Sequence, residues 1–137
     1  MSKTGPIIII DDDPDDQEMI HRILSRLTPE TELKKFNDGE AALAYFLSTK
    51  DRPFIVLCDI NMPLMNGLEL RKKMETEPMV KQKMTPFIYL TTTASPDQVL
   101  MAHHLAVQGF FVKGQSYNEL KETLTDIMAY WKRCERP

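Results

Sequence analysis

The chain has 137 residues, the size of one domain with a proper core, and 42% of them are apolar while 27% are charged. This composition excludes a disordered protein, and at a net charge of −3 the scattered Lys and Arg residues form no basic stripe for nucleic acid. No apolar run approaches the length of a membrane span or the core of a signal peptide. Two cysteines, Cys58 and Cys134, make no disulfide framework. We therefore expect a cytoplasmic protein that binds neither nucleic acid nor membrane.

Five short apolar segments predict β-strands. The predicted strands are 7–10, 33–36, 54–58, 87–90 and 110–112. The first and third are unbroken apolar runs, which is typical of strands that are buried on both faces of a parallel sheet. The second is more polar, which places it at an edge of the sheet. The first and third strands should therefore lie side by side at the centre of the sheet.

Helical spacing of apolar residues predicts one helix after each strand. The predicted helices run approximately over 14–27, 41–47, 68–75, 96–108 and 120–133. Segment 75–86 carries two prolines and mixed charge, and we expect it to be a loop. The fourth helix begins at Ser95, and Gly109 is expected to close it as a left-handed cap. The residues expected to bury that helix are Val99, Leu100, Leu105 and Ala106, with Met101 as a further candidate.

Strict alternation of strands and helices with short connections specifies right-handed crossovers, and hence a parallel sheet with helices on both faces. The fold class is thus α/β, a three-layer α/β/α sandwich with five strands and five helices. A strand order of 2-1-3-4-5 places the first and third strands next to each other. We expect a single domain over 1–137, with its core at about 6–133.

Polar residues follow four of the predicted strands. These residues are Asp11 and Asp12 after the first strand, Asp59 after the third, Thr91 after the fourth and Lys113 after the fifth. Parallel strands bring all five to the same edge of the sheet, where open α/β sheets bind their ligands. Each residue alone has an ordinary structural explanation, as a turn, a helix start or a surface salt bridge. Their joint placement favours a functional site.

The residue types at this edge indicate a chemistry. Three carboxylates within a few ångströms repel one another unless a cation enters, and all-oxygen ligands with room for water favour Mg²⁺. The run from Asp11 to Asp16 does not fit the Ca²⁺-binding loop, because it lacks the mid-loop Gly and the Glu at position twelve. A carboxylate beside Mg²⁺, a lysine ammonium and a threonine hydroxyl suits the handling of a phosphoryl group.

Over nearly its whole length the chain resembles the receiver domain of bacterial two-component response regulators. The residues that carry the resemblance are the Asp11-Asp12 pair after the first strand, Asp59-Ile-Asn-Met-Pro-Leu-Met-Asn-Gly67, Leu90-Thr91-Thr92 and Phe111-Val-Lys113. The resemblance implies a flavodoxin-like fold and a phosphoprotein of a two-component or phosphorelay system. It further implies a single-domain module that catalyses only its own phosphorylation and dephosphorylation and is otherwise not an enzyme.

The resemblance also implies a role for each site residue. Asp59 would be the nucleophile that receives the phosphoryl group, and Lys113 would bridge to Asp11 or Asp59 before holding a phosphoryl oxygen. Thr91 and the aromatic Phe110 would form the switch that reshapes the face around the last strand. The implied Mg²⁺ ligands are Asp12 and Asp59 directly, the backbone carbonyl of Asn61, and Asp11 through water.

The partners implied by the resemblance are a sensor histidine kinase or a histidine phosphotransfer protein, a downstream protein target, and a second copy in a homodimer. The sequence departs from the family at two positions. Gly114 follows the lysine where the family usually has proline, often through a cis bond, and the sequence leaves the conformation of this bond open. Phe110 stands where many relatives have tyrosine, so a switch there would work through packing alone.

Two other functions on the same fold fit less well. Aspartate-nucleophile phosphatases of the haloacid-dehalogenase type need a second Asp two residues after the first, and this chain has Asn61 there. A flavin or nucleotide carrier needs a phosphate-cradling first loop, whereas the acidic run after the first strand would repel an anion. His103 and His104 are adjacent on a helix and cannot form a two-histidine ligand pair, so we expect them to face solvent or a partner.

Overall fold

The computed structural model describes residues 5–137 and contains one five-stranded parallel sheet in the order β2-β1-β3-β4-β5. The strands are β1 (Ile7–Ile10), β2 (Leu33–Phe36), β3 (Ile55–Cys58), β4 (Phe87–Thr91) and β5 (Gly109–Val112). The helices are α1 (Pro14–Leu27), α2 (Gly39–Ser48), α3 (Gly67–Glu75), α4 (Pro78–Lys81), α5 (Pro96–His104) and α6 (Tyr117–Arg133). The expected α/β class and strand order are confirmed, and the arrangement is the flavodoxin-like one.

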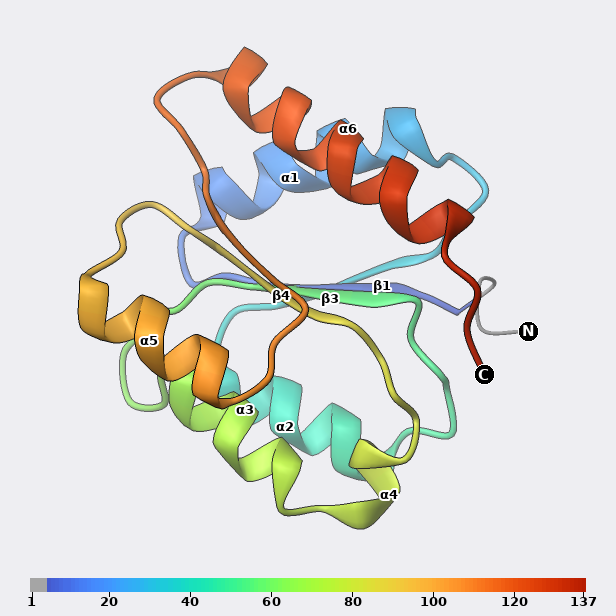
Figure 1. Ribbon diagram of the computed structural model, residues 1–137. Coiled ribbons are helices and arrows are strands. Elements are labelled where there is room, and N and C mark those ends of the chain that lie inside the picture. The colour runs from blue at the N-terminus through green and yellow to red at the C-terminus, as the bar shows by residue number, and fades with distance from the viewer. Residues whose placement is uncertain (1–4) are drawn as a thin grey trace.

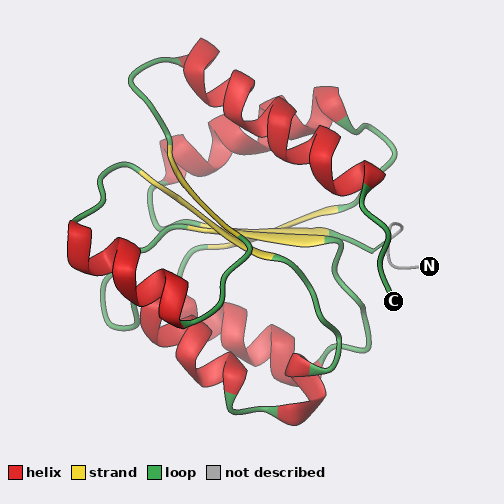
Figure 2. Cartoon of the chain, in the orientation of Figure 1, coloured by secondary structure: helices red, strands yellow, loops and turns green. Residues whose placement is uncertain are grey.

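The sheet lies between two layers of helices, with α1 and α6 on one face and α2, α3 and α5 on the other (Figures 1 and 2). Alternate residues of β1 serve the two layers, because successive side chains of a strand point to opposite faces. Ile7 and Ile9 pack with the α1 and α6 side chains, whereas Ile8 and Ile10 pack with the other layer. This double burial explains why β1 is a run of four isoleucines.

The register of the sheet places the ends of β1 and β3 side by side. Ile10 pairs with Cys58 across the two strands, and the Asp59 amide donates to the Ile10 carbonyl at 2.9 Å. On the other side of β1 the Asp11 amide donates to the Phe36 carbonyl at 3.1 Å. The residues that follow β1 and β3 are therefore neighbours, although 48 positions separate Asp11 from Asp59.

The segment expected to be a loop between α3 and β4 contains the short helix α4, so the helix count is six rather than five. Pro78 occupies the first turn of α4, where its fixed φ favours a helical start and its missing amide hydrogen costs nothing. The helix is a single turn with no buried residue. It is too short to produce the periodic apolar pattern on which the prediction of helices depended.

The prediction for the fourth helix was wrong in its burial and in its end. Leu100 is 60% exposed and Met101 47% exposed, and Ala106 is exposed as well. Val99 and Leu105 are half-buried, and Ala102 is the buried residue of α5. The helix ends at His104, and the left-handed residue after it is Ala106 (φ 56°), because Gly109 already belongs to β5. Helix α5 covers an edge of the sheet, where few side chains are available to bury it.

Across residues 5–137, no helix combines the length and the apolar character that crossing a membrane requires.

Candidate functional site

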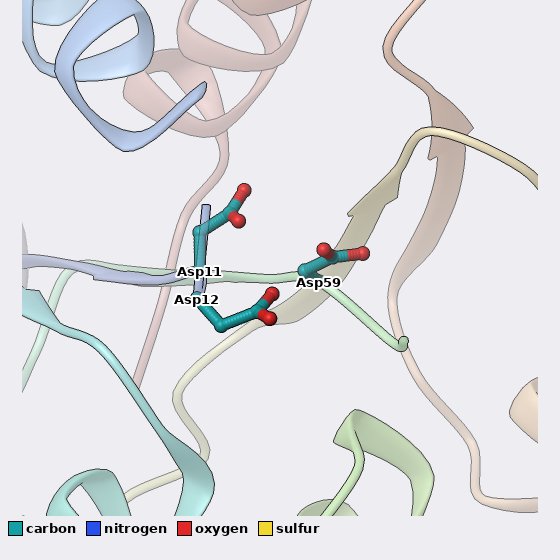
Figure 3. Close-up of side chains that lie close together, drawn as sticks. All are labelled: Asp11, Asp12 and Asp59. Atoms are coloured by element: carbon teal, nitrogen blue, oxygen red, sulfur yellow. The ribbon is translucent and has the colours of Figure 1, made fainter. Parts of the chain in front are cut away.

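Three carboxyl groups meet where β1 and β3 end, and we call Asp11, Asp12 and Asp59 the carboxylate cluster (Figure 3). One carboxylate oxygen from each lies within 4.8 Å of the others. Asp11 and Asp59 are buried, whereas Asp12 is exposed, and its side chain extends toward Asp59 (Figure 3). The convergence expected from the parallel strands is therefore present.

Backbone amides hold the two buried carboxylates in place. The Ile60 amide donates to Asp59 Oδ1 at 2.8 Å, and the Asp13 amide donates to Asp11 Oδ1 at 3.0 Å. The strand end itself is tied to α1, because Gln17 Nε2 donates to the carbonyl oxygens of Asp11 (3.2 Å) and Phe36 (3.0 Å). Local hydrogen bonds thus fix the rotation of both carboxylates before any ligand binds.

Lys113 reaches this cluster from the end of β5. Its Nζ lies 2.6 Å from Asp11 Oδ2, 2.8 Å from Asp16 Oδ2 and 3.8 Å from Asp59 Oδ2, and the side chain is buried. No peptide bond within residues 5–137 is cis, so the Lys113–Gly114 bond is trans. Gly114 has φ +87°, and a Cβ there would lie 2.8 Å from Glu119, so this turn requires glycine.

Burial and charge change the proton affinities at the site. Burial raises the pKa of Asp11 to about 6, although the hydrogen bond and charge of Lys113 oppose that shift. Burial alone would lower the pKa of Lys113, but its hydrogen bonds to Asp11 and Asp16, together with the negative charges of Asp11 and Asp59, outweigh burial, and the pKa is raised. Lys113 is therefore a permanent cation, while Asp11 is a carboxylate whose charge is costly without further compensation.

Thr91 and Asn61 belong to a chain of polar contacts that leads away from the cluster. Thr91 is buried at the end of β4, and its Oγ1 donates to the Thr93 carbonyl at 3.2 Å. Asn61 Nδ2 lies 3.5 Å from Thr91 Oγ1, and Gln98 Nε2 donates to Asn61 Oδ1 at 2.8 Å. These contacts connect the loop after Asp59 to the first turn of α5.

The other residues singled out from the sequence lie farther out. Phe110 in β5 is half-buried, with its ring centroid 5.8 Å from that of Tyr89. His103 and His104 are exposed in the last turn of α5, as expected. The carbonyl oxygen of Asn61 accepts no hydrogen bond from the described residues, so it is available as a ligand.

Two residues with contacts at the site were missed in the sequence analysis. Asp16 was assigned only to the first turn of α1, yet it forms an ion pair with Lys113 at 2.8 Å. Gln98 lies in the first turn of the predicted helix 96–108, yet its amide group binds the Asn61 side chain. The excess of carboxylates between Asp11 and Asp16 was the one available signal for the first. The second had none, because a Gln three residues after Ser95 is explained by the capping box that the structure shows.

The donor set fits a hard divalent cation. Carboxylate oxygens and a free carbonyl oxygen are the ligands that Mg²⁺ prefers, and Asp12 leaves the site open to water. The cluster concentrates negative charge that the single Lys113 ammonium neutralises only in part. A cation and an incoming phosphoryl oxygen could therefore share this edge of the sheet.

Comparison with known proteins agrees with this geometry. The family model of the response regulator receiver domain matches residues 7–125. The relative "Response regulator Rcp1" of Synechocystis sp. is 26% identical over 130 residues, covering 91% of this chain and 87% of Rcp1. The "Chemotaxis protein CheY homolog" of Campylobacter jejuni is 32% identical over 123 residues, covering 89% of this chain and 91% of the homolog.

Solved structures show the same fold. The Mn²⁺-bound form of response regulator Rcp1 has a TM-score of 0.86 at 25% identity, over 97% of this chain and 99% of that one. The phosphorylated cyanobacterial phytochrome response regulator RcpA has a TM-score of 0.87 at 23% identity, over 96% of each chain. Together with the family match, these findings identify a two-component signalling module rather than a classical enzyme, and the chain belongs to the response regulator receiver domain family.

Proposed function

We propose that this protein is a phosphorylation-controlled switch in which Asp59 accepts a phosphoryl group from a phosphohistidine. The donor is a sensor histidine kinase or a histidine phosphotransfer protein. The observation that carries the proposal is the convergence of three carboxylates within 4.8 Å, with the Lys113 ammonium 3.8 Å from Asp59. Relatives that include a chemotaxis CheY homolog and Rcp1 support a signalling role.

In the transfer, a carboxylate oxygen of Asp59 forms a bond to phosphorus as the phosphorus–nitrogen bond to the donor histidine breaks. The electron pair of that bond returns to the imidazole nitrogen. The Ile60 amide holds Asp59 Oδ1 and so keeps the carboxylate facing the open side of the site. Lys113 then binds a phosphoryl oxygen, and Thr91 donates its hydroxyl to another.

The metal in this proposal is Mg²⁺, held by Asp12, Asp59 and the Asn61 carbonyl directly and by Asp11 through water. When bound it supplies positive charge to the phosphoryl oxygens. The similar Rcp1 structure is a Mn²⁺-bound form, which supports a divalent ion here. The raised pKa of Asp11 also supports a bound cation, because it shows that the buried carboxylate lacks enough nearby positive charge.

The output of the switch is a change at α5 and β5. Thr91 moves toward the phosphoryl group and leaves Thr93, and the half-buried Phe110 turns further inward. Leu100, Met101 and Val112 are already exposed apolar residues of these two elements, and they would bind a downstream protein or a second copy. The protein either signals through such contacts or passes the phosphoryl group on as a phosphorelay intermediate.

The remaining parts of the proposal concern the whole chain. Residues 1–137 would form a single receiver domain that acts in the cytoplasm, where free thiols such as Cys58 persist. Its only catalysis would be its own phosphorylation and dephosphorylation. Asn61 supports this view, because its side chain is bound to Gln98 and supplies no second carboxylate for hydrolysis.

The test is labelling with acetyl phosphate and Mg²⁺, followed by mass spectrometry of the modified peptide. We expect one phosphoryl group on Asp59, no labelling of Asp59→Asn, and no labelling without Mg²⁺. Asp126→Asn is the matched control, because it makes the same change at an exposed position on α6. Undiminished labelling of Asp59→Asn would refute the assignment of the phosphoacceptor.

A further inference from the structure

A cavity of about 230 Å³ lies at the end of the sheet opposite the carboxylate cluster. Its walls include Pro53, Thr85 and Gln108, which come just before β3, β4 and β5, whereas the cluster follows the carboxyl ends of strands. The C-terminal turn of α3 and the helix α4 also contribute to the walls, and Figure 1 shows α4 at the end of the sheet where the C-terminus lies. The site proposed above makes no use of this cavity.

One wall of the cavity is a buried arginine with few partners. The Arg71 side chain is 10% exposed and lies over the Phe87 ring, 5.2 Å from its centroid. A guanidinium carries five N–H donors, but the described residues accept only one hydrogen bond, from Nε to the Leu105 carbonyl at 3.5 Å. Glu75 forms an ion pair with Nη2 at 3.4 Å. Arg71 lines the cavity, and its remaining guanidinium donors stay accessible there, because Arg136 Nη1 is the one buried side-chain N or O atom without a partner among the described residues.

The charge of the cavity wall favours an anion. Arg71, Lys81 and Lys83 contribute three positive charges and Glu75 one negative charge, so the wall carries +2 in a chain of net −3. Lys83 is fixed in position, because its Nζ donates to the carbonyl oxygens of Thr49 (2.9 Å) and Asp51 (2.7 Å). The backbone therefore holds the positive charge of Lys83 in place at the cavity.

Much of the remaining wall is apolar, and two of its residues have a backbone with positive φ. Phe46, Met74 and Val80 provide the apolar surface. Met84 (φ 52°) and Ala106 (φ 56°) also line the cavity, and they are two of the three non-glycine residues with positive φ in the described chain. Backbone strain of this kind persists where the surrounding structure holds it, and it is concentrated at binding sites.

We propose that this cavity binds a small organic anion whose carboxylate pairs with Arg71 and whose apolar body packs against Phe46, Met74 and Val80. A carboxylate binds a guanidinium through two parallel charge-assisted hydrogen bonds, and Arg71 has unused donors for such bidentate pairing. The ligand would also touch the connection between α5 and β5, because Arg71 donates to Leu105 and Ala106 forms part of the wall. Binding there requires neither Asp59 nor its phosphorylation.

The test uses phenylacetate as the probe and its neutral analogue phenylacetamide as the matched ligand, added to the intact chain in metal-free buffer. We expect saturable changes in the amide NMR signals of Met74, Ala106 and Gln108, with phenylacetate binding about tenfold more tightly than phenylacetamide. Equal affinity of the two probes, or no saturable change at these residues, would overturn the proposal. Neither result bears on labelling of Asp59.

Two variants distinguish the effect of Arg71 on ligand binding from the effect of losing any one positive charge on α3. Arg71→Met should abolish the preference for phenylacetate, whereas Lys72→Met makes the same charge change at an exposed position of α3 and should leave it intact. Circular dichroism checks that both variants fold. If Arg71→Met does not fold, the comparison of the two probes on the unchanged chain still decides. A preference that survives in folded Arg71→Met would overturn the assignment of the anion to Arg71.

Discussion

The α1–α6 layer and the α5–β5 edge both border the proposed phosphorylation site, but they differ in how many buried contacts hold them. Helix α6 buries four residues, Leu120, Leu124, Ile127 and Met128, against α1 and the sheet. Helix α5 buries Ala102 alone, and all four residues of β5 keep some exposure. Elements with few buried apolar contacts open locally at low cost. The α1–α6 layer is therefore the more rigid region, and the α5–β5 edge is the region that a small chemical change can rearrange.

The largest test of this contrast is the removal of one leucine side chain from each region. Leu124→Ala should lower the free energy of unfolding by about 3 kcal/mol, because it leaves a cavity in the core. Leu100→Ala, at a position that is 60% exposed, should change it by less than about 0.5 kcal/mol. Urea denaturation measures both. Similar losses in the two variants would mean that α5 is held as firmly as α6.

The charge at the junction of the two regions should make stability depend on pH. The pKa of folded Asp11 is about 6, above its ordinary value of 3.8, so its contribution to stability is present below pH 3.8 and is lost as pH rises through 6. In metal-free buffer, moving from pH 4 to 7 should therefore cost the native chain on the order of 2 kcal/mol relative to Asp11→Asn. Denaturation of both proteins at the two pH values measures this difference, and parallel pH profiles would contradict it.

Lys113 joins the two regions, because it follows β5 and pairs with Asp11 and with Asp16 of α1. Lys113→Ala should still accept a phosphoryl group but should lose coupling to the α5–β5 edge worth about 1 kcal/mol. The measurement is the change in α5 and β5 amide NMR signals on phosphorylation, which should shrink. Lys121→Ala removes an exposed lysine of α6 as the control. A full response in Lys113→Ala would show that this lysine does not transmit the signal.

The smallest expected effect concerns Gln98, which ties α5 to the loop after Asp59. Gln98→Ala removes the bond to Asn61 and the bond to the Ser95 amide, and it should weaken α5 locally by about 1 kcal/mol. Hydrogen exchange of α5 amides should accelerate about fivefold, while α1 amides are unchanged. Gln115→Ala, at an exposed glutamine without hydrogen bonds to the described residues, is the control. Equal acceleration in α1 would refute a local effect.

The sequence predicted the well-buried elements better than the exposed α5–β5 edge. The isoleucines of β1 and the apolar run of β3 are buried on both faces, so their pattern alone predicts central strands and the meeting of Asp11 with Asp59. Helix α5 has the spacing of a buried helix, but its exposure depends on how little chain is available to cover that edge. No local pattern contains that information.

The ion pair between Asp16 and Lys113 escaped prediction for a different reason. It depends on the rotation of α1 about its axis and on the reach of a side chain from a residue 97 positions away. The role of Gln98 depends likewise on where the loop after Asp59 turns. Sequence spacing identifies which strand ends share an edge, but it does not give the positions of side chains that arrive there from helices.

The pairing of Lys113 with Asp11 joins residues 102 positions apart, and Lys113 lies beyond the final strand. During synthesis, a chain that is still short of β5 would already contain both Asp59 and its acidic neighbours, yet it would lack their cation. Such a fragment would have no β5 to rearrange, so incomplete translation products would be silent toward a downstream protein even if they met the kinase. If the chain is the switch proposed above, it could relay a signal only after the last strand has docked, so signalling would depend on complete folding.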